Sequence, residues 1–151
     1  MNDLLVVGWR EWVGLPDLGI TQIKAKVDTG ARTSAIHAFN LRPFFEDGVQ
    51  RIEFHVNPHQ RDTDTVFVCT ADVIDQRVVM DSGGNKEDRW VIGSHLTVGG
   101  FSWPIELTLT ARDDMRFRML LGRHALKKRA LVDPTASYLL GKKIGKIKNP
   151  K

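Results

Sequence analysis

Apolar residues recur at every second position through most of the chain, in short stretches bounded by Gly, Pro, Asn and Asp. A period of two is the pattern of β-strands with one buried face. Ile23, Ala25 and Val27, for instance, alternate with Lys24 and Lys26 just before Asp28. The pattern predicts strands at residues 4–13, 23–27, 34–39, 51–56, 65–74, 76–80, 89–98 and 101–110.

Turn residues separate these stretches. Leu15–Gly19, with Pro early and Gly late, predicts a turn, and residues 82–85 and 99–100 predict hairpin turns. Pro104 lies inside an alternating stretch, so its strand should lie at a sheet edge or begin after it. Arg10 and Glu11, placed between two tryptophans, are expected on the solvated side of the first strand.

Helical character is confined to residues 123–130, which follow the apolar run Met119–Leu121 and Gly122. Many short strands with one late helix predict an all-β domain, a closed or nearly closed β-barrel, over residues 1–140. The chain has 151 residues, and its 42% hydrophobic and 26% charged residues are typical of one globular domain.

The net charge of +4 comes from the end of the chain. Residues 141–151 carry no acid and the basic residues Lys142, Lys143, Lys146, Lys148 and Lys151. The remaining body is nearly neutral, so we expect a solvated, mobile basic tail and no nucleic-acid partner. A phosphate-contacting arm is the alternative.

Cys69 is the single cysteine, which excludes an internal disulfide and a usual structural zinc site. The start of the chain has no basic region and only a four-residue apolar run, Leu4–Val7, too short for a signal peptide or membrane span. We therefore expect a cytoplasmic protein without a membrane partner.

Asp28-Thr29-Gly30 at the end of a strand is the sharpest chemical signal. Two carboxylates that share one proton can grip a water and hydrolyse a peptide bond, because like charges this close cannot both ionise. The Thr29 hydroxyl can hydrogen-bond to a second copy of the loop, and Gly30 lets two backbones approach. The alternative is an aspartate that only caps a turn.

A second segment, Leu120–Arg123, lies about ninety residues further on. With residues 28–31 it resembles the pattern of retropepsin-type aspartic proteases, in which two chains each supply one Asp. Residues 7–12, 15–19, 25–38 and 119–123 are more closely similar to a bacterial retropepsin-like family with the older label "ATP-dependent zinc protease". The likeness spans residues 6–141.

The resemblance implies an acid-protease barrel, a homodimer, a peptide or protein substrate, no cofactor, and a link to enzymes that ligate glutamate to proteins. It implies that Asp28 is catalytic. Support for the catalytic loop would come from Thr29, Gly30, Ala31, Leu120, Leu121, Gly122 and Arg123.

Arg32 departs from the retroviral pattern, which has an acidic residue there to pair with the later arginine. Arg32 and Arg123 cannot form that ion pair, so contacts near the site must differ. Their charge beside the dyad suggests a preference for acidic substrates, with Arg32 as the charge partner.

Asp81-Ser82-Gly83 is a second motif of the Asp-Ser/Thr-Gly type. A second catalytic aspartate in the same chain is one interpretation, but no second apolar-apolar-Gly segment supports another lobe. With Gly84 it fits better the tip of a flap hairpin that closes over substrate, or a plain turn.

The sequence lacks the usual motifs for binding the zinc and ATP that the older label names. The histidines form no His-Glu-x-x-His, and Pro58 separates His55 from His59 on what is not a helix. No phosphate-binding Gly-rich loop occurs. We expect no metal and an aspartic endopeptidase; an inactive peptide-binding module and a zinc peptidase are the alternatives.

Overall fold

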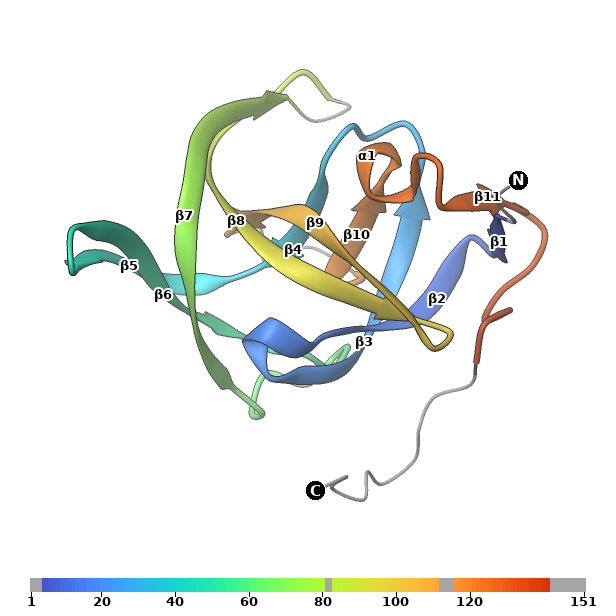
Figure 1. The fold of residues 1–151 in the computed structure, drawn as a ribbon, viewed down its shortest axis with the longest axis horizontal. Helices are drawn as coiled ribbons and strands as arrows, with labels where there is room; N and C mark the ends of the chain where they lie inside the picture. Colours follow the sequence, from blue (N-terminus) through green and yellow to red (C-terminus); the bar gives the residue numbers. More distant parts are fainter. Residues whose placement is uncertain (1–3, 81–82, 112–115, 142–151) are drawn as a thin grey trace.

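A computed structural model describes residues 4–80, 83–111 and 116–141. Eleven strands and two short helical turns are found in these residues (Figure 1). In chain order they are β1 (Leu5–Val7), β2 (Arg10–Leu15), the 3-10 turn η1 (Pro16–Leu18), β3 (Ile20–Asp28), β4 (Ser34–His37), β5 (Phe39–Glu46), β6 (Val49–Val56), β7 (Phe67–Met80), β8 (Lys86–Val98), β9 (Phe101–Thr110), β10 (Met119–Gly122), α1 (Arg123–Leu126) and β11 (Ala130–Val132).

Nine strands form one curled sheet in the order β2-β3-β10-β4-β9-β8-β7-β6-β5. The sheet bends until β2 meets β8 at one residue pair, Gly14 and Thr97. A side chain at Gly14 would meet the Thr97 hydroxyl, so glycine allows this close approach. The predicted all-β barrel domain is therefore confirmed, as a barrel that is not fully closed.

The predicted alternation of β3 is confirmed, because Ile23, Ala25 and Val27 are buried while Lys26 is exposed. They join a single core inside the curled sheet. The largest side chains that are fully buried in it are Phe54, Leu15, Ile20, Ile23, Ile36, Ile52, Ile92, Leu96, Leu107, Leu109, Met119 and Leu121.

The strand predicted at residues 4–13 is divided into two strands in the structure, β1 and β2. The chain breaks at Gly8 and Trp9, where Gly8 lies so close to the backbone of Ala136 that any side chain would clash. β1 leaves the main sheet and pairs in parallel with β11 (Leu5 with Ala130) instead.

Glu11 was expected on the solvated side of this strand, but it is fully buried. Its carboxylate accepts hydrogen bonds from the backbone N–H groups of Gly8, Leu139 and Leu140. The neighbouring Arg10 guanidinium lies between the rings of Trp9 and Tyr138.

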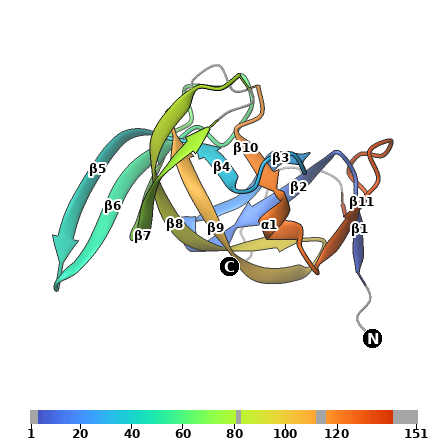
Figure 2. The same cartoon turned by 90° about the horizontal axis from the view of Figure 1, so that it is seen from above.

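The predicted strands at residues 65–74 and 76–80 form one strand, β7, with a register shift between Val73 and Asp75. The hairpin of β5 and β6, which projects from the barrel (Figures 1 and 2), turns at Asp47 and Gly48, both with positive φ. Most of β5 was not predicted.

The turn at Leu15–Gly19 is confirmed, since Gly19 ends η1 in the left-handed conformation. Gly99 and Gly100 both have positive φ between β8 and β9, as the hairpin prediction requires. The prediction for Pro104 is wrong, because β9 begins at Phe101 and is an inner strand between β4 and β8. Proline is tolerated there because β4 pairs with β9 only from Leu107 onward, so no strand needs an N–H from Pro104 on that side.

The helix is shorter than predicted. It ends at Leu126, and the chain then turns through Lys128, which has positive φ, to reach β11. Asp81, Ser82 and the basic tail from Lys142 lie outside the described residues. Within the described part of the chain, no helix is long and apolar enough to cross a membrane.

Candidate active site

Asp28 is the last residue of β3, and β10 runs parallel beside it. Leu121 lies next to Val27 and Gly122 next to Asp28 in this pair. The two segments singled out in the sequence, residues 28–31 and 120–123, are therefore brought together at one end of the molecule (Figure 1).

The loop after β3 fixes the Asp28 carboxylate. Asp28 Oδ1 accepts a hydrogen bond of 3.0 Å from the Gly30 N–H, and the Asp28 carbonyl accepts one of 3.1 Å from the Ala31 N–H. Oδ2 makes no hydrogen bond to another described residue. One carboxylate oxygen is thus held by the backbone while the other is open to a water or substrate.

Gly122 and the first turn of α1 hold this loop from behind. Gly122 donates its N–H to Ser34 Oγ at 3.0 Å, and Arg123 donates its N–H to the Ala31 carbonyl at 2.9 Å. A Cβ on Gly122 would lie 2.6 Å from the Thr33 carbonyl. Only glycine fits this contact without displacing the loop, because real Cβ atoms do not approach a backbone carbonyl so closely.

The Arg123 side chain contacts the backbone of the Asp28 loop. Its guanidinium donates to the carbonyl oxygens of Thr29 and Gly30, at 3.4 and 3.3 Å. Arg32, on the same loop, is exposed, as Arg123 is.

Thr29 is exposed, so its predicted contact with a second copy of the loop stays a prediction. Leu121 is buried in the core and Leu120 is half-buried on the opposite side of β10.

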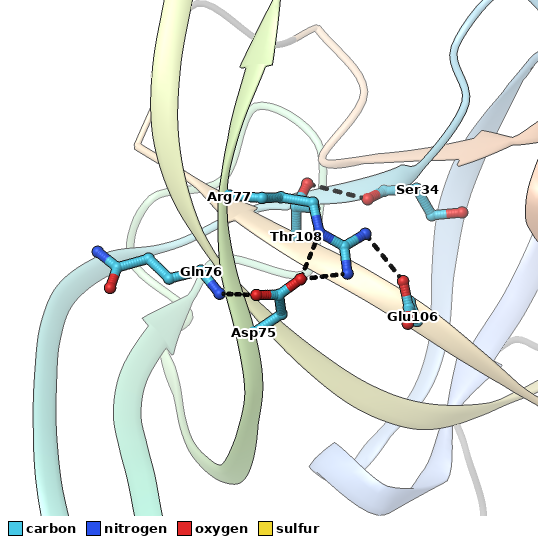
Figure 3. A network of polar contacts seen from close by, with 6 residues as sticks. All are labelled: Ser34, Asp75, Gln76, Arg77, Glu106 and Thr108. Carbon is cyan, nitrogen blue, oxygen red and sulfur yellow. Dashed lines mark hydrogen bonds and ion pairs between the residues drawn. The ribbon is translucent and has the colours of Figure 1, made fainter.

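A chain of polar side chains links β8 through β9 to Ser34, the first residue of β4, which follows the Asp28 loop. Arg89 donates to Glu87 Oε1 at 2.8 Å and to Thr108 Oγ1 at 3.1 Å. Thr108 in turn donates its hydroxyl to the Ser34 carbonyl at 3.0 Å (Figure 3), and Thr110 donates to Glu87 at 2.9 Å.

Sequence reasoning missed this network. Arg89 and Glu87 belong to a strand whose alternation would place them in solvent, and their partners Thr108 and Thr110 are about twenty residues away. No local spacing signals such a contact.

Arg77 fixes the base of the β7–β8 hairpin (Figure 3). It bonds Asp75 at 2.8 Å and Glu106 at 3.0 Å, which joins β7 to β9. The Arg77 side chain, together with the Gln76 N–H, holds the pKa of the Asp75 carboxyl below its ordinary value.

The hairpin predicted around residues 82–85 is present, because Met80 pairs with Lys86. Gly83 and Gly84 are exposed at its tip, and the tip lies at the same end of the molecule as the Asp28 loop in Figure 1. A flap role for the hairpin, and any contribution of Asp81, stay predictions.

Among the described residues, no three His, Cys, Asp or Glu side chains are grouped so that they could hold a metal ion. His55 instead bonds the Asn40 amide and packs edge-on against Phe39. Burial raises the pKa of the Cys69 thiol to about 11, as expected for a packing residue.

The chain is similar to a protein family, to curated proteins and to a solved structure. The family model described as "Retropepsin-like aspartic endopeptidase RimB" matches residues 6–143. A protein of Shewanella pealeana named "Probable alpha-L-glutamate ligase" is 46% identical over 142 residues, which is 94% of this chain and 31% of that protein. One of the same name from Parasynechococcus marenigrum is 50% identical over 141 residues, 93% of this chain and 30% of that protein.

The chain thus spans about a third of the length of these relatives. A crystal structure of Lpg0085, a Legionella pneumophila protein described as of unknown function, aligns with a TM-score of 0.75 at 23% identity and covers 91% of this chain and 99% of that one. At this identity the likeness concerns the fold.

Proposed function

The chain belongs to the RimB-like family of retropepsin-like aspartic endopeptidases, and from this premise we propose that it hydrolyses peptide bonds with Asp28 as its catalytic residue. The observation that carries the proposal is the geometry of the loop. Asp28 Oδ1 is fixed by the Gly30 N–H, while Oδ2 is open. The backing by Gly122 and Arg123 holds the carboxylate in place, as a catalytic group requires.

Hydrolysis by carboxylates needs a pair that shares one proton. We propose that the partner is Asp28 of a second copy, because the loop that carries Asp28 is exposed at Thr29 and Gly30. The active unit would then be a homodimer with one carboxylate from each chain.

The reaction proceeds through a water held between the two carboxyl groups. The ionised carboxylate takes a proton from the water as its oxygen attacks the peptide carbonyl carbon, and the protonated carboxyl gives its proton to the carbonyl oxygen. The tetrahedral intermediate then collapses: the C–N bond breaks, the leaving nitrogen takes the proton from the first carboxyl, and a hydroxyl of the intermediate returns a proton to the second carboxylate as the C=O bond re-forms. No cofactor enters this sequence.

The substrate we propose is a protein or peptide rich in glutamate. The regions that match this chain make up about a third of two proteins named "Probable alpha-L-glutamate ligase". A similar domain therefore occurs as part of proteins with that name. Arg32, exposed next to the catalytic loop, offers a positive charge to such a substrate.

Replacing Asp28 by Asn tests the proposal. The amide cannot take a proton from water, so cleavage of a glutamate-rich peptide should fall by at least about a hundredfold. Cleavage is measured by mass spectrometry of the products, and folding by the melting temperature, which should stay close to that of the parent.

Asp47→Asn is the matched control, because Asp47 lies in the exposed turn of the β5–β6 hairpin and Asn tolerates its positive φ. It should cleave like the parent. A fully active Asp28→Asn variant would contradict the proposal, and a protein that binds peptide but never cleaves it would favour a binding module.

A further inference from the structure

The sheet has a second face besides the one that encloses the core. Phe117, Met119 and Leu121 are buried in the core, so the residues between them, Arg118 and Leu120, point to the opposite face. The backbone of Arg118 continues the β10 ladder, since its carbonyl accepts the His37 N–H at 2.9 Å. This face also carries Thr108 and Arg89 of the polar network described above.

Arg118 is buried on this face without an anion. Arg118 is only 7% exposed, and its Nε makes no hydrogen bond. None of the ion pairs among the described residues includes it.

Two other arginines with buried nitrogens are accounted for. Arg10 lies over the rings of Trp9 and Tyr138, at 4.5 and 4.8 Å from their centroids. Arg89 is paired with Glu87 at 2.8 Å. Arg118 has neither kind of partner among the described residues.

A guanidinium withdrawn from water without a compensating anion is costly, and it is found where a bound group supplies the missing charge. The Nε and a terminal nitrogen of arginine together match the two oxygens of a carboxylate. A carboxylate would therefore satisfy the Arg118 guanidinium better than a neutral group would.

Arg118 lies a few residues' length from Asp28 along the sheet. Gly122 lies beside Asp28 in the register of β3 and β10. Arg118 lies four residues before Gly122 in the chain, just before the start of β10. At about 3.3 Å per residue this is roughly 13 Å, which an extended peptide spans with about four residues.

We propose that Arg118 is a specificity-determining residue that binds the carboxylate of an acidic substrate side chain a few residues from the scissile bond. The inference rests on the proposed peptidase function and adds the residue that selects glutamate. The buried Arg118 would select one acidic side chain, in addition to the charge that the exposed Arg32 offers beside the loop.

Binding is measured separately from cleavage, so that the two proposals can fail independently. The Asp28→Asn protein is titrated into two fluorescently labelled peptides, one with a run of glutamates and one with glutamines in their place, and anisotropy gives the affinities. The glutamate peptide should bind more tightly. Adding Arg118→Gln should weaken it by roughly tenfold or more and leave the glutamine peptide unchanged.

Arg118→Lys and Arg42→Gln complete the set. Lysine keeps the charge but not the two-point geometry and should bind between the parent and Arg118→Gln. Arg42 lies on the projecting β5–β6 hairpin, where it pairs with Glu53, and its loss should change nothing. Melting temperatures of all variants show whether each is folded.

Equal binding of both peptides by the parent, or glutamate binding unaffected in a folded Arg118→Gln or Arg118→Lys variant, would overturn the role of Arg118. Selective binding that depends on Arg118, without cleavage by the wild-type protein, would leave that role standing and overturn the peptidase proposal instead.

Discussion

Glu11 shows how one buried carboxylate can organise chain segments that are far apart in sequence. It is 0% exposed, and it accepts backbone N–H groups of Gly8 at 2.7 Å, Leu139 at 2.9 Å and Leu140 at 3.2 Å. One side chain thus satisfies three backbone donors, of which that of Gly8 is buried and those of Leu139 and Leu140 are partly buried. Glu11 thereby fastens the segment after β11 to the start of β2.

Glu11→Ala should lower the free energy of unfolding by about 3 kcal/mol, because it leaves these donors without acceptors. Urea denaturation followed by circular dichroism measures the change. Glu53→Ala serves as the control, since Glu53 makes a partly exposed ion pair with Arg42 that should contribute less than about 1 kcal/mol. Equal losses in the two variants would show that Glu11 does not fasten the segment.

Sequence alone could not place Glu11, Arg89 or Arg118. Glu11 and Arg89 lie in strands whose polar positions suggest solvent, and Arg118 precedes β10, but all three are buried in the fold. Asp28 and its loop were predictable because the residues that shape the carboxylate, such as Gly30, are its immediate neighbours. The sequence therefore predicts the local part of the site, and the tertiary structure adds the rest.

At the scale of elements, period-two alternation predicted the strands that line the core and failed where strands leave it. In β5 most residues are exposed or half-buried on both faces, because the hairpin projects from the barrel, and Phe45 at its tip is 71% exposed. The turn Asp47-Gly48 was the signal that could have revealed this hairpin. β11 is three residues long, too short for any periodicity.

The turn η1 is tied to β8 by Asp17. Its carboxylate accepts the backbone N–H of His95 at 2.7 Å and contacts the His95 ring Nδ1 at 2.9 Å. The backbone hydrogen bond and then the ring contact lower the pKa of Asp17. A lowered pKa means that the interaction stabilises the fold while Asp17 is ionised, and that this stabilisation is lost as the pH falls through the folded-state pKa.

Asp17→Asn should therefore lower the melting temperature at neutral pH, and its difference from the parent should shrink below about pH 4. Thermal denaturation from pH 7 to pH 3 measures both. Asp47→Asn is again the control, because Asp47 makes no side-chain hydrogen bond to a described residue. A difference that stays constant over this pH range would rule out a charge-dependent contact.

At the scale of the whole molecule, the proposed peptidase depends on pairing. The described chain presents one Asp28 loop, and two carboxylates are needed for the reaction. Association should therefore be visible in solution and should control activity.

Mixing wild-type and Asp28→Asn protein tests the shared dyad directly through the rate of cleavage. Adding Asp28→Asn protein in excess to wild-type protein should reduce cleavage per wild-type chain, because mixed pairs hold only one catalytic carboxylate. Sedimentation should give a species of twice 17.1 kDa under the same conditions. A monomer at high concentration, with activity unaffected by added Asp28→Asn protein, would exclude the shared dyad.

The parallel pairing of β3 with β10 has a consequence for the order of folding. Arg123, which holds the loop by its contact with the Thr29 carbonyl, lies 94 positions away from it in the chain. Contacts between such distant positions form late, because the intervening chain must first be ordered. A chain emerging from the ribosome therefore has no assembled Asp28 loop until residue 123 has been made and has folded back, so the proposed peptidase site forms only after that point.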